Sequence, residues 1–244
     1  AEGSAGDTDA GAVADAVPPY LIPNLAIDHL PVQTGLPAGY WRSNAASITG
    51  FLNESFVDEL ASAARVDPLS FRMGRLGDAP RLARCLQAAT ALGGWDGGGS
   101  GSGQGVAAMS LRGSHIALMA DARPGERGLV VERFSVAVDC GRVINPTLVR
   151  QQIEGGLIFG LAMAVGVSSR YRRGLAQARR LADLNLPLLG QTPQIEIELI
   201  TSRAAPGGVS EIAVPLVAPA IANALFTITG QRIRRLPLSP AALP

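Results

Sequence analysis

The sequence of 244 residues contains no lysine, so arginine alone carries its positive side-chain charge. Acidic and basic residues nearly balance, with a formal net charge of +1, which gives no electrostatic support for a nucleic-acid partner. We therefore expect no nucleic-acid binding. Aromatic residues are scarce at 5%, whereas 47% of the residues are hydrophobic and 17% are charged. This balance is typical of a globular chain and excludes an intrinsically disordered one.

Side chains that ligate metals are also few. The two cysteines, Cys85 and Cys140, lie far apart in the sequence, and the two histidines, His29 and His115, form no cluster with them. Zinc-finger and iron–sulfur motifs need closely spaced cysteine or histidine ligands. The sequence therefore predicts that no side chain of this chain binds a metal directly.

Long hydrophobic runs are absent as well. The longest candidate, 155–167, is interrupted by glycine and is shorter than the roughly 20 residues that a membrane-spanning helix needs. No transmembrane segment is predicted. Residues 1–17 are small and acidic, carry no positively charged signal-peptide region, and are expected to form a flexible lead-in. We interpret the chain as part of a longer protein or as a separate subunit.

Hydrophobic periodicity predicts an α+β fold in which a mixed sheet packs against helices. A run with eight glycines among thirteen residues, 93–105, is the expected linker between a first part, 18–92, and a second part, 106–244. The expected helices span 47–65, 80–92, 147–165 and 213–229, and a further helix starts at Asp67-Pro68. The expected strands span 24–30, 106–110, 115–121, 129–139, 194–201 and 232–238.

The glycine-rich turn before the last predicted helix is the first candidate for chemistry. Gly207 and Gly208 precede Glu211, which has mostly apolar neighbours. If such a carboxylate is buried, its pKa rises toward neutrality and it becomes a competent general base. The alternative is a carboxylate at a helix start, where the helix dipole favours negative charge. Taken alone, these residues favour the second interpretation.

A second candidate lies inside the predicted helix 147–165. Gly155 and its neighbour Gly156 each cost about 1 kcal/mol relative to alanine, a cost accepted where a cofactor or another helix packs against bare backbone. Gln152 can donate and accept hydrogen bonds, which suits a polar heterocycle, but close helix packing with an exposed glutamine explains the pattern equally well. Arg42 can bind an anion through its guanidinium group, or it can be a surface or interdomain residue.

In order and spacing, these segments resemble the C-terminal half of the large subunits of molybdenum hydroxylases. The group concerned belongs to the xanthine dehydrogenase and aldehyde oxidase family and is typified by the β subunit of isoquinoline 1-oxidoreductase. The resemblance covers most of the chain after residue 16 and rests on seven collinear segments. These are Pro18-Pro19-Tyr20, Trp41-Arg42-Ser43, 54–61 with Asp67-Pro68-Leu69, 138–146, 152–156, 207–211, and 218–224 with Arg235-Leu236-Pro237.

This resemblance implies the molybdopterin-binding domain of an oxidoreductase that hydroxylates an N-heteroaromatic or aldehyde substrate with oxygen from water. It implies a molybdenum–molybdopterin cytosine dinucleotide cofactor and a partner subunit whose iron–sulfur clusters take the electrons. It also implies the N-terminal half of the large subunit as a further partner. The family pattern places the base at Glu211 and cofactor-side contacts at Gln152, Arg42, Gly155 and Gly208.

The chain departs from this family pattern in several places. Ser210 stands where glycine is usual, Arg112 stands where an aromatic residue is common, and 170–180 is rich in arginine where a sheet hairpin is expected. The glycine-rich cofactor loops of the upstream half are missing from the sequence. The alternative to an enzyme is therefore a non-catalytic structural or interaction protein that keeps the fold without binding the cofactor.

Overall fold

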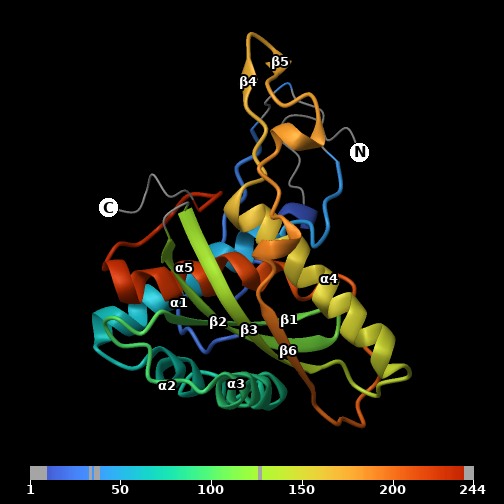
Figure 1. Cartoon of the computed structure of the whole chain (residues 1–244). Helices are drawn as coiled ribbons and strands as arrows, with labels where there is room; N and C mark the ends of the chain where they lie inside the picture. The colour runs from blue at the N-terminus through green and yellow to red at the C-terminus, as the bar shows by residue number, and fades with distance from the viewer. Residues whose placement is uncertain (1–9, 33–34, 36–38, 126–127, 239–244) are drawn as a thin grey trace.

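A four-stranded sheet with the order β1-β2-β3-β6 forms the centre of the computed structural model, which describes residues 10–32, 35, 39–125 and 128–238 (Figure 1). The strands are β1 (Gln104–Leu111), β2 (Ser114–Gly125), β3 (Gly128–Asp139) and β6 (Gln194–Leu199). The first three pair antiparallel, whereas β6 pairs parallel with β3. This arrangement confirms the predicted α+β class with a mixed sheet.

Helices cover both faces of the sheet (Figure 1). Helix α3 (Pro80–Gly93), with α2 (Pro68–Met73) beside it, lies on one face. Helix α5 (Val214–Thr229) lies on the other face and packs against α1 (Ala46–Ala64) and α4 (Pro146–Val165). The predicted helices are confirmed to within a few residues at each end.

Two of these helices begin with the capping residues that the sequence indicated. The side chain of Asp67 accepts a hydrogen bond from the backbone N–H of Ser70, and the side chain of Asn145 accepts one from the N–H of Leu148. A proline follows each cap at the first helical position, where its fixed φ suits the helix and its missing N–H loses no bond. Both predicted starts are confirmed.

Two predicted strands were wrong, because the described residues of 24–30 and 232–238 pair with no strand. Alternation of polar and apolar residues predicts a strand only where a sheet edge is available to pair with it. In the second stretch, long-range ion pairs replace sheet pairing. Arg232 forms an ion pair with Asp58 of α1, in which Nη1 of the arginine lies 2.7 Å from Oδ2 of the aspartate.

The arginine-rich stretch 170–180 contains a small hairpin that projects from the layered body (Figure 1). Strands β4 (Tyr171–Arg172) and β5 (Leu175–Ala176) pair antiparallel across a turn formed by Arg173 and Gly174, both with positive φ. The arginines do not disrupt the hairpin because their side chains lie in solvent.

The sheet separates two clusters of buried apolar residues. One cluster, which includes Phe134 and Leu216, lies between the sheet and helices α4 and α5. The other, which includes Leu86 and Met119, lies between the opposite face and α3. Residues from before and after the glycine-rich stretch 93–105 share this second cluster, so the stretch connects elements that pack against one another.

A buried polar network joins the N-terminal segment to α1, α2 and β1. The carboxylate of Glu54 accepts hydrogen bonds from the hydroxyl of Tyr20 at 2.8 Å and from the N–H of Ala108 at 3.0 Å. The fully buried guanidinium of Arg72 contacts Glu54 Oε2 at 3.1 Å and Asp58 Oδ1 at 3.2 Å. Burial raises the pKa of Glu54, and the attraction of Arg72 opposes this rise.

Strand β1 and helix α5 pack backbone to backbone at Gly105. A Cβ atom there would lie 2.2 Å from the carbonyl oxygen of Ala220 and 2.3 Å from the nitrogen of Ala224. Because neither atom can move without shifting the helix, Gly105→Ala is expected to lower the free energy of unfolding by about 1–3 kcal/mol. At Gly99 nothing lies within 4 Å, so Gly99→Ala is the matched control. Urea denaturation compares the two, and equal effects would contradict this packing.

Candidate functional site

The loop that carries Glu211 is held by hydrogen bonds to two other turns. The N–H of Gly207 donates to the carbonyl of Cys140, which follows β3, at 2.9 Å. The N–H of Gly208 donates to the carbonyl of Arg112, between β1 and β2, also at 2.9 Å. The glycine turn is thus fixed against one end of the sheet.

The end of β3 is itself anchored by an ion pair from α3. Arg81 donates from Nε and Nη2 to the two carboxylate oxygens of Asp139, at 2.9 and 2.6 Å. These hydrogen bonds lower the pKa of the buried Asp139 to about 2. Asp139 also accepts the N–H of Gly141 at 3.0 Å, so the ion pair shapes the turn that receives Gly207.

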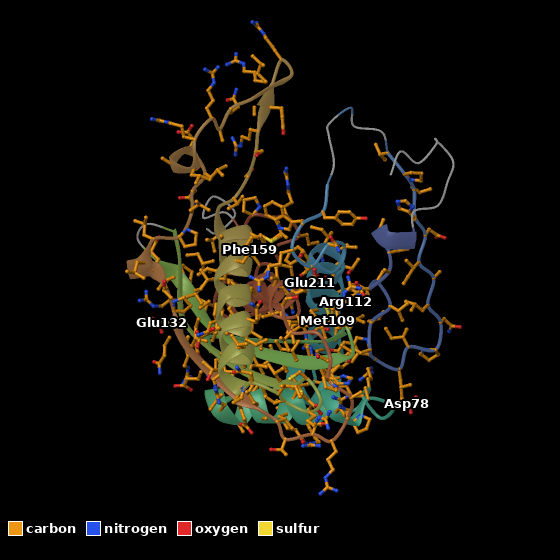
Figure 2. All side chains as sticks on the ribbon, turned by 90° about the vertical axis from the view of Figure 1, so that its right-hand side faces the viewer. Asp78, Met109, Arg112, Glu132, Phe159 and Glu211 are labelled. Atoms are coloured by element: carbon orange, nitrogen blue, oxygen red, sulfur yellow. The ribbon has the colours of Figure 1, made fainter. Side chains whose placement is uncertain are left out.

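The carboxylate of Glu211 is half-buried and paired with an arginine (Figure 2). Its Oε2 lies 3.3 Å from Nε of Arg112, and 28% of the Glu211 side chain is exposed. The residue precedes α5, and its backbone oxygen accepts the N–H of Val214, the first residue of that helix, at 3.3 Å. The carboxylate therefore matches neither a fully buried base nor a side chain that caps the helix.

Arg42 connects the Glu211 loop to α4. Its Nε donates to the backbone oxygen of Ser210 at 2.7 Å, and its Nη2 lies 3.2 Å from the backbone oxygen and 3.4 Å from Oε1 of Gln152. The hydroxyl of Ser43 donates to the backbone oxygen of Glu211 at 2.5 Å. The structure therefore brings together Arg42, Gln152 and Glu211, which the sequence singled out separately.

The side chain of Arg42 lies beside two glycines of α4. A Cβ atom at Gly155 would lie 3.8 Å from Nη1 of Arg42, and one at Gly156 would lie 3.5 Å from Nη2 and 3.0 Å from Cβ of Ala213. The ring of Phe159, one turn further along α4, lies 5.7 Å from Cζ of Arg42. Close helix packing explains Gly156 in part, and the side chain of Arg42 occupies the space beside both glycines.

Three residues with a left-handed backbone conformation lie at or next to this site. Ser43, Asn44 and Arg112 have φ angles of 73°, 44° and 54°, a left-handed region that residues with a Cβ atom rarely adopt. Two further non-glycine residues have positive φ angles: Arg65 follows the C-terminus of α1, and Arg173 lies in the turn between β4 and β5. Strained residues persist only where surrounding contacts hold them, and they are concentrated at functional sites.

Two kinds of site are absent from the part of the chain that the structure describes. No group of three or more His, Cys, Asp or Glu side chains is placed to hold a metal ion there, and both cysteines, Cys85 and Cys140, are free and buried. None of the helices in the described ranges has the length and apolar character needed to cross a membrane.

Hydrogen-bond donors and bare backbone characterise the site instead. Arg42 and Arg112 supply positive charge, Gln152 supplies an exposed amide, and Gly155 leaves backbone accessible. The buried hydroxyl of Ser114 has no hydrogen-bond partner among the described residues. It lies close to Gly207, where a Cβ atom would be only 2.3 Å from it. This donor set fits an anionic ligand rather than a bare metal ion.

The sequence singled out five residues that the structure places at this site, Arg42, Gln152, Gly155, Gly208 and Glu211, but it assigned no role to Arg112 or Ser43. The signal for Arg112 is its place before Gly113 between two apolar strands, a pattern in which a two-residue turn brings the side chain to the sheet edge. Ser43 has no comparable signal, because its hydrogen bond to Glu211 depends on contact between distant parts of the chain.

Comparison with known proteins identifies related sequences. A family described as molybdopterin cofactor-binding domain matches residues 123–193. The β subunit of isoquinoline 1-oxidoreductase from Brevundimonas diminuta is 33% identical over 241 residues, which cover 96% of this chain and 31% of that protein. One subunit of the nicotinate dehydrogenase from Pseudomonas putida is 26% identical over 248 residues, which cover 92% of this chain and 21% of that protein.

A solved structure shares the fold. The aldehyde oxidoreductase from Desulfovibrio gigas superimposes with a TM-score of 0.66 at 15% identity, over 83% of this chain and 41% of that one. At this identity the likeness bears on the fold alone. The chain thus spans 31% or less of the length of the two curated relatives named above.

Proposed function

We propose that this chain carries the catalytic base and part of the cofactor site of a molybdenum hydroxylase of the xanthine dehydrogenase family, because its sequence is similar to subunits of such enzymes. One observation carries the proposal. Hydrogen bonds from Arg42 and Ser43 join the Glu211 loop to Gln152 on α4, although these residues lie far apart in the sequence.

The proposed cofactor is molybdenum–molybdopterin in its cytosine dinucleotide form. When bound, it supplies the two-electron oxidation and the oxygen that comes from water. Arg42 and Gln152 are the proposed donors to its polar groups, since both present hydrogen-bonding nitrogen atoms at the surface of α4. Gly155 and Gly208, which are both exposed and lie beside Arg42 and Arg112 respectively, are the further proposed contacts with the cofactor.

Glu211 is the proposed proton acceptor. The bond from Ser43 to its backbone and the contact with Arg112 fix its position, and its partial exposure leaves the carboxylate within reach of a ligand. A positioned carboxylate is a competent general base for a group whose acidity a metal has raised. Proton acceptance needs a free lone pair, which the second carboxylate oxygen offers while Oε2 contacts Arg112.

The proposed substrates are N-heteroaromatic compounds or aldehydes, and the proposed electron acceptor is an iron–sulfur subunit. Two relatives are named for isoquinoline and nicotinate, and another, 28% identical over 117 residues, is the molybdenum-binding subunit of an aldehyde oxidoreductase from Escherichia coli. The test uses the assembled large subunit. This term means this chain together with a polypeptide that corresponds to the part of the relatives with which this chain does not align. With an N-heteroaromatic substrate in water enriched in oxygen-18, the product should gain one labelled oxygen. A product without label would contradict the proposal.

Helix α1 has an apolar face that is open to solvent in this chain. Ile48, Leu52, Phe56 and Leu60 are 53%, 56%, 58% and 38% exposed, and their spacing of four places them along one side of the helix. Contiguous exposed apolar surface marks an interaction site. We propose that the polypeptide corresponding to the rest of the large subunit covers this face.

A charge on that face should block assembly without unfolding the chain. Phe56→Glu is expected to change the free energy of unfolding by less than about 0.5 kcal/mol, because the side chain is already exposed. The same change should prevent association with the remaining polypeptide, measured by co-purification and size-exclusion chromatography. Ala91→Glu adds the same charge to an exposed position on α3 and should assemble normally. Normal assembly of the Phe56 variant would contradict the proposed interface.

A further inference from the structure

We propose that Arg112 is the residue that recognises the substrate, and that it selects substrates bearing a carboxylate or a similar anionic group. This inference rests on the proposed function, in which Glu211 is the base. It adds a substrate class and a residue that determines specificity.

The conformation of Arg112 is the first observation. Leu111 pairs with Ser114, so Arg112 and Gly113 form a two-residue turn in which both φ angles are positive, 54° and 77°. Asparagine, aspartate and glycine favour the first position of such a turn, whereas arginine is disfavoured there. Arg173 adopts the same conformation in the exposed hairpin, so the conformation of Arg112 bears on function only together with its position beside the candidate base.

The contacts of Arg112 are the second observation. Gly208 approaches so closely that a Cβ atom there would lie 3.0 Å from Cβ of Arg112, and the N–H of Gly208 binds the Arg112 carbonyl. The guanidinium contacts Glu211 through Nε alone, at 3.3 Å, and half of the side chain is exposed. Among the described residues, its two terminal nitrogens have no hydrogen-bond partner.

These free donors can bind an anion beside the base. A guanidinium group binds a carboxylate through two parallel hydrogen bonds, and this geometry selects carboxylates over neutral amides. A substrate carboxylate on Arg112 competes with Glu211 for the positive charge and leaves Glu211 free to accept a proton. Arg42 is less suited to this role, because its Nε and Nη2 already bind Ser210 and Gln152, which leaves Nη1 as the nitrogen without a hydrogen bond among the described residues.

Binding is tested first on the chain by itself, without cofactor. The side-chain Nε signals of arginine are followed by NMR during titration with benzoate or with benzamide. Benzoate should shift the Arg112 signal, benzamide should not, and Arg112→Asn should remove the response. Arg123 is the matched control, since its Nε lies 2.6 Å from the carboxylate of Glu132, it is equally exposed, and Figure 2 shows Glu132 far from Glu211. An unmoved Arg112 signal, or an equal shift at Arg123, would overturn the inference.

Stability separates recognition from a structural role. Asparagine suits the left-handed turn, so Arg112→Asn should raise the melting temperature by about 2–4 °C while anion binding is lost. A lower melting temperature would show that the arginine serves the fold, and it would count against the inference.

Turnover by the assembled, molybdenum-loaded large subunit distinguishes this inference from the proposed function. With 4-formylbenzoate, Arg112→Asn should lower kcat/KM by about 10- to 100-fold, as expected when hydrogen bonds to a charged group are lost. With 4-formylbenzamide, which lacks the charged group, the loss in kcat/KM should be smaller than with 4-formylbenzoate by about tenfold or more. Equal losses on both substrates would overturn the inference and leave the base assignment intact. If the wild type oxidises neither substrate, the proposed function is contradicted for aldehydes, and the NMR titration alone decides on Arg112.

Discussion

Replacing Glu211 with glutamine is expected to lower turnover about 10²- to 10⁴-fold in the assembled large subunit. Glutamine keeps the size and shape of the side chain but cannot accept a proton at physiological pH. The hydrogen bond from Ser43 goes to the backbone of this residue and therefore remains in the variant. Steady-state kcat and the molybdenum content should be measured together, because only kcat is expected to fall.

The control for this substitution is Glu132→Gln. Glu132 also pairs with an arginine, Arg123, and is 53% exposed, but Figure 2 shows it at the left-hand edge of the view, away from Glu211 near the centre. Its replacement should leave turnover unchanged. Wild-type turnover in the Glu211 variant would instead indicate an unrelated binding domain or a remnant in which this carboxylate has no chemical role.

The second large effect is expected in the buried network around Arg72. Arg72→Leu should lower the free energy of unfolding by about 3–5 kcal/mol, because it leaves the buried carboxylate of Glu54 without its cation. Asp58 is affected less, since Arg232 also contacts it at 2.7 Å. Urea denaturation of the chain measures the change.

Two comparisons test the cause of this destabilisation. Arg84→Leu removes an exposed arginine from α3 and should change stability by less than about 0.5 kcal/mol. The double variant Glu54→Leu/Arg72→Leu should recover only part of the loss, since it removes the uncompensated charge but leaves the Tyr20 hydroxyl and the Ala108 N–H without their acceptor. If Arg72→Leu and Arg84→Leu destabilise equally, the network has no special role in holding α1 and α2 to the sheet.

Elements governed by local chemistry could be predicted from the sequence. The helix starts at Asp67 and Asn145 follow from side-chain caps and the prolines after them, which act within a few residues. The stretches 24–30 and 232–238 could not be predicted correctly, because a strand also needs a neighbouring edge. In the second stretch, Arg232 contacts α1 instead.

The candidate site could be predicted only in part, for a similar reason. Glu211, Gln152 and Arg42 lie in segments whose glycines or order along the chain resemble a known family. Arg112 could not be assigned a partner from the sequence, because its contact with Glu211 arises only when the turn after β1 meets the turn at Gly208. A contact between turns that are distant in the sequence produces no local sequence pattern from which it could be predicted.

Ser210, which stands where the family pattern usually has glycine, is compatible with the geometry of the site. Arg42 binds the backbone oxygen of Ser210 at 2.7 Å, a contact that glycine would also make, and the serine side chain is exposed. The substitution from the usual glycine therefore does not disturb the connection between Arg42 and the Glu211 loop. Arg112 differs in this respect, because its own side chain contacts the candidate base.

The most direct test of the central claim is the molybdenum and pterin content of the assembled large subunit. A homologous large subunit, produced in the same host, serves as the positive control for cofactor supply. The account predicts about one molybdenum atom and one pterin for each copy of this chain. A loaded homologue beside an assembled subunit that contains neither would contradict the account and identify the chain as a fold retained without its cofactor.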